Sequence, residues 1–221
     1  MQLHEFIQRN KEAEGGDVFQ LENSKLLDIA VDGETWLKAG AMVAYTGDLS
    51  FKKKTGGGVA GWLKQQATGE GARTMLVSGQ GHVYVADHGK YVHVLHLQDG
   101  ESLSVNGNDV LAYESSVSVD ITMMKKIASL ASGGLFNVQL RGPGRIAFTT
   151  HGSPVVLETP VRTDPHATVA WSSDTPPSFT TDIGWKSMLG STSGEEFQMD
   201  FDQPGGFVVV QPYEEVVGAN S

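Results

Sequence analysis

The fold of this chain is decided by the stretch Met75-Leu76-Val77-Ser78-Gly79-Gln80-Gly81-His82-Val83-Tyr84-Val85. Val83 and Val85 alternate with Tyr84, which is the two-residue period of a half-buried β-strand. A glycine after Gln80 suits a turn position that needs a positive φ. The stretch therefore predicts a strand, a glycine turn and a second strand.

The same pattern occurs twice more along the chain. Residues 138–148 repeat it around Pro143-Gly144, and residues 199–209 repeat it around Pro204-Gly205. Gly81, Gly144 and Gly206 stand 63 and 62 residues apart. A fixed period of this length is typical of a repeat architecture.

A second motif recurs between the copies of the first. Its copies start at Asp32, Asp99 and Asp164 and end at Tyr45, Tyr113 and Trp171. The three aromatic residues stand 68 and 58 residues apart. Two motifs in the same order, three times each, predict repeats at about residues 32–97, 99–160 and 162–215 within a single domain of residues 1–221.

One copy of such a unit could not bury its apolar face, so we expect the three copies to close around a shared core. The predicted fold is all-β: a pseudo-threefold antiparallel β-sandwich or prism with short helical or loop excursions. Residues 1–15 predict an amphipathic lead-in with Leu3, Phe6 and Ile7 on one helical face. Residues 216–221 are expected to be frayed.

The third copy differs from the others by its prolines. Pro165, Pro176 and Pro177 stand where the other copies have strand residues. Because proline removes a backbone donor, we expect this copy to hold a sheet edge, which is a natural place for docking.

Composition excludes several classes of function. With 26 acidic and 16 basic residues the formal charge is −10, so the surface repels phosphate backbones and no nucleic-acid partner is expected. The absence of cysteine excludes disulfides, thiolate nucleophiles and cysteine zinc sites. No signal peptide or apolar run of membrane-helix length is found, which predicts a cytoplasmic protein.

Between the two motifs each copy departs from the strand pattern, at residues 52–64, 123–130 and 183–189. All three excursions carry large apolar side chains beside lysine, a combination that suits an interaction surface. The candidate residues are Trp62, Leu63, Met123, Met124, Trp185 and Met188. The alternative interpretation is that apolar residues of the excursions plug the open ends of the β core.

Patterns that carry chemistry are weak, and we predict no catalytic residue, no metal site and no cofactor. Four of the seven histidines fall in one stretch, at His82, His88, His93 and His96. On a strand His93 and His96 point to opposite faces and cannot chelate together. The lysines before residues 56–58 are in the wrong order for a phosphate loop, no nucleophile elbow occurs, and Asp200 and Asp202 suit a charged surface.

Three strings point to a known family. Residues 40–47, the glycines of residues 56–58 and residues 142–145 resemble the altered-inheritance-of-mitochondria protein 24 family, the mitochondrial biogenesis family with many uncharacterised bacterial members. The resemblance covers roughly residues 15–215. It implies a fold like that of the tryptophan RNA-binding attenuation protein (TRAP), a β-sandwich that assembles into rings, and a link to inner-membrane organisation in mitochondrial members. It implies no catalytic residue.

These observations favour a non-enzymatic β-repeat protein that binds or acts as a scaffold, through self-association as a homo-oligomer or through a protein partner. The alternative class is a small-ligand-binding protein or hydrolase with a pocket at a repeat junction. A weaker alternative is peripheral association with a membrane surface through the lysines of residues 52–54 and Trp62.

Overall fold

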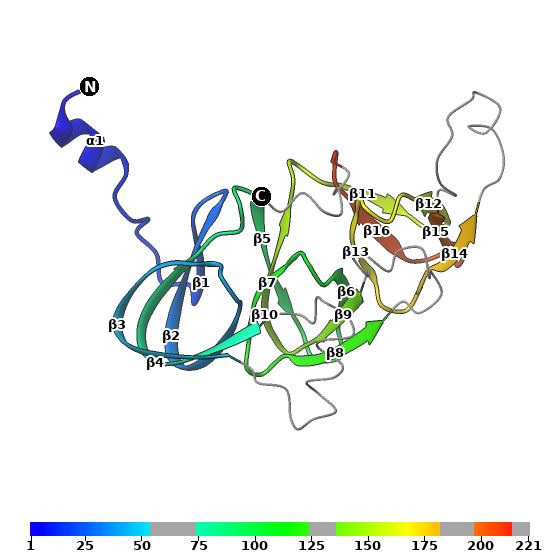
Figure 1. Ribbon diagram of the computed structural model, residues 1–221, viewed down its shortest axis with the longest axis horizontal. Coiled ribbons are helices and arrows are strands. Elements are labelled where there is room, and N and C mark those ends of the chain that lie inside the picture. Colours follow the sequence, from blue (N-terminus) through cyan, green and yellow to red (C-terminus); the bar gives the residue numbers. More distant parts are fainter. Residues whose placement is uncertain (54–73, 124–135, 182–196, 214–221) are drawn as a thin grey trace.

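The computed structural model describes residues 1–53, 74–123, 136–181 and 197–213 (Figure 1). These residues form one short helix, α1 (Leu3–Arg9), and 16 strands in three antiparallel sheets. The all-β expectation is confirmed at this level. Within the described ranges no helix has both the length and the apolar composition needed to cross a bilayer.

The first sheet has seven strands in the order β3-β4-β2-β7-β10-β5, with β1 paired to β2. Its strands are β1 (Phe19–Asn23), β2 (Leu26–Lys38), β3 (Met42–Lys53), β4 (Thr74–Val85), β5 (Tyr91–Leu97), β7 (Val110–Glu114) and β10 (Gly144–Thr150). Three of them, β2, β3 and β4, have 12 or 13 residues and curve strongly along their length (Figure 1).

The other two sheets follow from the middle of the chain onward. The second sheet has the order β11-β16-β13-β6-β9-β8 and the third the order β12-β15-β14. Their strands are β6 (Ser102–Asn106), β8 (Ser118–Met123), β9 (Phe136–Arg141), β11 (Val155–Glu158), β12 (Val161–Thr163), β13 (Thr168–Ser172), β14 (Ser178–Thr181), β15 (Phe197–Phe201) and β16 (Phe207–Val210). β12 and β14 are the outer strands of the third sheet, and Pro165, Pro176 and Pro177 lie in the connections next to them, not within strands.

Buried apolar side chains of the described residues form three clusters, which follow one another along the longest axis of the molecule (Figure 1). The first core lies within the curved part of the first sheet, around Leu27, Val83 and Leu111. The third core lies between the second and third sheets, around Trp171 and Phe201. The expectation of one core shared by three copies is therefore wrong for the described part of the chain.

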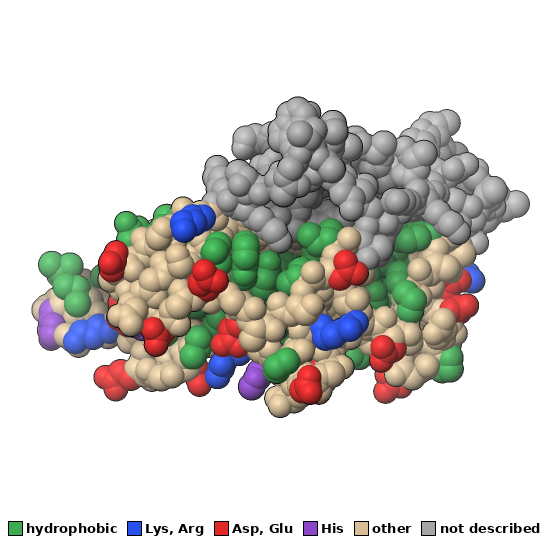
Figure 2. Space-filling view, turned by 90° about the horizontal axis from the view of Figure 1, so that it is seen from below, with side chains coloured by type: hydrophobic (Ala, Val, Ile, Leu, Met, Phe, Trp, Pro, Cys, Tyr) green, Lys and Arg blue, Asp and Glu red, His purple; other side chains and the backbone are tan. Residues whose placement is uncertain are grey.

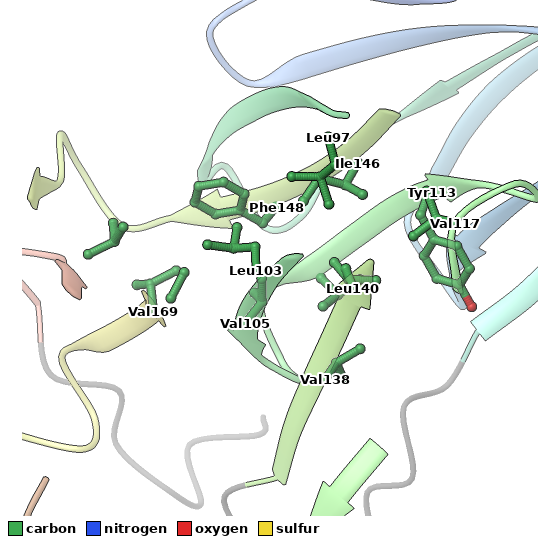
Figure 3. Close-up of a cluster of buried hydrophobic side chains, with 13 residues drawn as sticks. Leu97, Leu103, Val105, Tyr113, Val117, Val138, Leu140, Ile146, Phe148 and Val169 are labelled. Atoms are coloured by element: carbon green, nitrogen blue, oxygen red, sulfur yellow. The ribbon is translucent and has the colours of Figure 1, made fainter. Parts of the chain in front are cut away.

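The middle core lies between the first and second sheets (Figure 3). Strands at its boundary are buried on both faces. On β10, Ile146 and Phe148 face the middle core while Ala147 faces the first core. On β16, Val209 faces the middle core while Val208 faces the third. Successive side chains of a strand point to opposite faces, so one strand can supply side chains to the cores on both of its sides. Neighbouring cores therefore share the strand that lies between them.

The glycine turn predicted between two strands is wrong for Gln80-Gly81, and the hairpin pairing expected at the other two glycine turns is not found. Gln80-Gly81 lies inside the continuous strand β4, so no turn occurs there. Pro143-Gly144 joins β9 to β10 and Pro204-Gly205 joins β15 to β16, but the strands of each pair belong to different sheets. Alternation along the sequence predicts a strand and its buried face, whereas it does not say which strand is the partner. At these glycines the chain passes from one sheet to the next.

Glycine has a steric role where the long strands curve. Gly47 of β3 pairs with Gly81 of β4, and Gly33 of β2 pairs with Gly79. Gly47 has a φ of +82°, and a Cβ there would overlap the backbone carbonyl of Gln80. The close approach of β3 to β4 therefore depends on the missing side chain.

The lead-in is a helix, as predicted, and its apolar side chains are uncovered. Leu3, Phe6 and Ile7 are all exposed on α1. The helix stands away from the sheets at the left end of the molecule (Figure 1). The frayed terminus expected at residues 216–221 lies outside the described residues.

We predict that Gly47→Ala lowers the free energy of unfolding by at least about 2 kcal/mol, because strain at a positive φ adds to a backbone overlap. Gly40→Ala is the matched control: its φ is +90° and nothing lies within 4 Å of a Cβ built there. Urea unfolding followed by circular dichroism measures both. If both variants lost the same free energy of unfolding, the close approach of β3 to β4 at Gly47 would not be the cause of the loss.

Candidate functional site

The interaction residues predicted from the sequence fall almost entirely outside the described part of the chain. This holds for Trp62, Leu63, Met124, Trp185 and Met188. Met123 is the last residue of β8 and pairs with Phe136 of β9, which fixes its backbone position alone. The choice between an interaction surface and a core plug stays a prediction.

The described residues do show where the three excursions start and end. Each one joins the ends of two adjacent antiparallel strands, at the pairs Lys53↔Met75, Met123↔Phe136 and Thr181↔Phe197. The strand pairs are β3 with β4, β8 with β9, and β14 with β15. Each excursion thus extends from the corresponding end of a matching strand pair.

The first sheet ends at β3 on one side and at β5 on the other, and β3 has one described neighbour, which is β4. Residues 42–46 of this strand are all exposed, and we call them the β3 edge. Met42, Val43 and Tyr45 are 39, 62 and 50% exposed. Proteins commonly protect edge strands with charge or proline, because an apolar edge offers its backbone to another strand.

Two other strands carry a similar order of residues, which aligns with this one in sequence, and bury it. In β7 the counterparts are Val110, Leu111, Ala112 and Tyr113, and in β13 they are Thr168, Val169, Ala170 and Trp171. All eight are at most 5% exposed. In each of the three strands the register shifts at the second residue of the set, which is a β-bulge at Val43, Leu111 and Val169.

The difference in burial between the β3 edge and strands β7 and β13 accompanies a difference in strand pairing. On the side away from β10, strand β7 pairs with β2, and Tyr113 lies opposite Trp36 with the rings stacked at 6.1 Å between centroids. On the side away from β16, strand β13 pairs with β6, and Trp171 lies opposite Ser104. The β3 edge has no such second neighbour among the described residues.

A cluster of four buried or half-buried charges lies where the first core meets the middle core. Lys38 Nζ donates to Asp87 Oδ2 at 2.8 Å and to the carbonyl oxygen of Asn108 at 2.6 Å. Lys90 Nζ donates to Asp109 Oδ1 at 2.8 Å. We call Lys38, Asp87, Lys90 and Asp109 the junction clamp. It ties the end of β2, the loop from β4 to β5 and the turn before β7 together.

Thr149 of β10 completes the junction clamp. Its hydroxyl donates to Asp87 Oδ2 at 3.0 Å, and its backbone N–H donates to the carbonyl oxygen of Asp109 at 2.8 Å. Burial alone would raise the pKa of Asp87, but the charges of Lys38 and Lys90 and these hydrogen bonds outweigh burial and lower the pKa. Asp87 is therefore held in its charged form.

The chemistry open to the junction clamp follows from its burial. Asp87 and Asp109 are 3 and 1% exposed, and each accepts a hydrogen bond from a lysine. A general base must reach a substrate proton, which a buried and paired carboxylate does not do in this conformation. The arrangement is that of a structural ion-pair network, whose loss leaves an uncompensated buried charge.

The four clustered histidines are separated by the fold. His82 Nδ1 lies 2.9 Å from Asp28 Oδ2, and burial raises the pKa of Asp28 although His82 opposes the rise. His93 Nε2 lies 2.8 Å from Thr150 Oγ1, and burial lowers the pKa of His93. His96 is exposed on β5. Among the described residues no three His, Asp or Glu side chains come together as metal ligands.

The carboxylates singled out in the sequence also separate. Arg162 Nε donates to Asp200 Oδ2 at 3.0 Å across the pair formed by β12 and β15. Asp202 follows β15 and is exposed. The two carboxylates thus serve different roles, one in an ion pair and one at the surface.

Sequence reasoning missed the junction clamp. Charged residues in short connections are mostly solvated, and Lys38, Asp87, Lys90 and Asp109 all lie at or beside strand ends. The sequence pattern that could have indicated the junction clamp is the presence of opposite charges in connections next to strongly apolar strands. That pattern is also common on protein surfaces, so only the structure shows that these four side chains are buried or half-buried.

We predict that Lys38→Met lowers the free energy of unfolding at pH 7 by about 2 to 4 kcal/mol, because it leaves the buried Asp87 carboxylate without its partner. The wild-type pairing contributes fully above the ordinary carboxyl pKa and is lost as pH falls through the lowered pKa of folded Asp87. The loss in the variant should therefore shrink below about pH 4. Urea unfolding across a pH series measures it.

Lys11→Met, at an exposed position in the lead-in, is the control for removing one positive charge. A loss in Lys38→Met that equals the loss in Lys11→Met, or that stays constant down to pH 3, would show that the charge of Asp87 does not depend on Lys38.

Comparison with known proteins agrees with this geometry. No functionally curated protein matches the chain. A solved structure, protein SPYM3_0169 from Streptococcus pyogenes, is similar with a TM-score of 0.67 at 19% identity, over 89% of this chain and 92% of that one. The family model described as mitochondrial biogenesis AIM24 matches residues 19–213. That match spans every strand described above, and the chain belongs to the AIM24 mitochondrial biogenesis family.

Proposed function

We propose that this protein is a non-enzymatic binding or scaffold protein that acts by self-association or through a protein partner. The observation that carries the proposal is the β3 edge, an apolar strand edge whose counterparts in β7 and β13 are buried. The function thus depends on strand pairing and apolar burial, which also hold the fold together.

The proposal includes an internal threefold repeat with a TRAP-like unit. Three bulged strands with the same apolar-Ala-aromatic order support it, and so does the repeated strand order β3-β4-β2, β8-β9-β6 and β14-β15-β12. In that reading β7 and β13 each dock on the preceding copy. Among the described residues no strand of another copy lies beside the bulged strand of the first copy, which is therefore left uncovered.

Burial energetics favour an occupant for the β3 edge. Covering a large apolar side chain contributes about 1.5 to 3 kcal/mol, and Met42, Val43 and Tyr45 are neighbours on one strand. Figure 2 shows hydrophobic, acidic and basic side chains interspersed over one face of the described residues. A strand edge adds backbone hydrogen bonds to apolar burial, which is how extended segments join sheets in many complexes.

We predict that the wild-type protein gains mass above 23.7 kDa as its concentration rises, and that Val43→Lys abolishes the gain. A lysine at the edge keeps its charge in water and opposes strand pairing. Light scattering across a concentration series measures the mass of both proteins.

Val155→Lys is the matched control, because Val155 is also exposed on an outer strand, β11, at 55% compared with 62% for Val43. It should associate like the wild type. A wild-type protein that stays at 23.7 kDa at every concentration would remove self-association. An equal loss of association in both variants would remove the β3 edge as the surface responsible.

A further inference from the structure

The chain contains two internal junctions built in the same way. In the first, β2 pairs with β7 through Thr35↔Glu114, Trp36↔Tyr113 and Leu37↔Ala112. In the second, β6 pairs with β13 through Leu103↔Ser172, Ser104↔Trp171 and Val105↔Ala170. Each junction is antiparallel, has three residue pairs and places the aromatic residue of the bulged strand at the middle pair.

Two edge strands of the described structure each resemble one of the two strands that form such a junction. The β3 edge carries the bulged strand, like β7 and β13, and has β4 on one side but no described strand on the other. At the other end, β12 is the outer strand of the third sheet, in the place that β6 takes in β6-β9-β8 and β2 takes in β2-β4-β3. One chain therefore offers both halves of a third junction.

We propose that β12 of one copy of the chain pairs with the β3 edge of a second copy, and so repeats the internal junction between molecules. The inference rests on the proposed function, since it names the partner as a second copy. The two edges lie at opposite ends of the longest axis (Figure 1), so the contact joins molecules head to tail.

The register of the contact follows from the two internal junctions. The central strands of the three sets, β4, β9 and β15, relate the junction strands to one another. Leu37 of β2 pairs with Met75, Val105 of β6 pairs with Val138, and Thr163 of β12 pairs with Met199. Thr163 thus corresponds to Leu37 and Val105, whose junction partners are Ala112 and Ala170. The matching residue on the β3 edge is Ala44. The expected pairs are Thr163↔Ala44, Arg162↔Tyr45 and Val161↔Thr46.

The side chains suit this register. Arg162 is exposed on β12 and would lie opposite Tyr45, as Trp36 lies opposite Tyr113. A guanidinium over an aromatic ring is a favourable contact, and Arg162 can keep its bond to Asp200 while it makes one. Val161 is half-buried, and Thr163 is buried.

A head-to-tail contact of this kind is heterologous, because each partner uses a different surface. Such contacts produce closed rings when the rotation between copies closes, and open chains when it does not. The associated species should therefore continue beyond a dimer, unlike a symmetric pairing of two β3 edges.

Cysteine cross-linking tests the register, because the wild-type chain contains no cysteine. Single variants Tyr45→Cys and Arg162→Cys are mixed under mild oxidation, and disulfide-linked dimers are separated by mass. Opposed residues of antiparallel strands have Cα atoms about 4.5 to 5.5 Å apart, within disulfide range. We expect the mixed dimer to form about tenfold or more faster than in a mixture of Ser50→Cys with Arg162→Cys, because docking raises the effective concentration.

Ser50 is exposed on the same strand, five positions beyond Tyr45, so Ser50→Cys matches the chemistry but not the register. Equal rates for the two mixtures would overturn the proposal, as would a Tyr45→Cys homodimer that forms faster than the mixed dimer. A double variant Tyr45→Cys/Arg162→Cys that forms its disulfide within a single chain would place the contact inside one molecule and also overturn it.

The outcome is separable from that of the proposed function. If the wild type gains mass with concentration but the mixed dimer does not form, the head-to-tail register is wrong and the scaffold function stands. If neither occurs, both are wrong. Thermal unfolding of the three single variants checks that each retains the fold, which is expected at exposed positions.

Discussion

The constraint on which this structure depends is that a bulged apolar strand needs a neighbour on each side. Strands β7 and β13 meet it with β10 and β16 on one side and with β2 and β6 on the other. Because their side chains then enter two cores, each such strand is a wall shared by neighbouring cores. The junction clamp reinforces the first of these walls with Lys38 and Asp87, whose charges are worth most as a pair in a buried setting.

Part of this architecture could be predicted from the sequence. Alternation at Val83 and Val85 indicated a strand, and both side chains are fully buried. The alignment of Tyr45, Tyr113 and Trp171 placed three residues that turn out to follow equivalent bulges. Strand partners could not be predicted, because a residue's neighbours in sequence do not determine which strand lies beside it. The hairpin pairing at the glycine turns and the single shared core were wrong for that reason.

The candidate site was predictable to a smaller extent. The exposure of Met42 and Val43 could not be predicted from the sequence of β3, since β7 carries similar residues and buries them. The predicted sheet edge in the third copy was the useful signal, and β12 supplies it. Membership of the AIM24 mitochondrial biogenesis family and the likeness to the Streptococcus pyogenes protein agree with the fold. The proposed role comes from the edges themselves.

The most direct test of the central claim is amide hydrogen exchange at several protein concentrations. Within residues 42–46 and 161–163, the backbone N–H groups that point away from β4 and β15 exchange slowly only when a further strand covers them. The outer strand β11 (Val155–Glu158) serves as an internal reference. The account predicts that exchange at both β3 and β12 slows together as concentration rises, with β11 unchanged. Exchange at β3 and β12 that is fast and independent of concentration would contradict it.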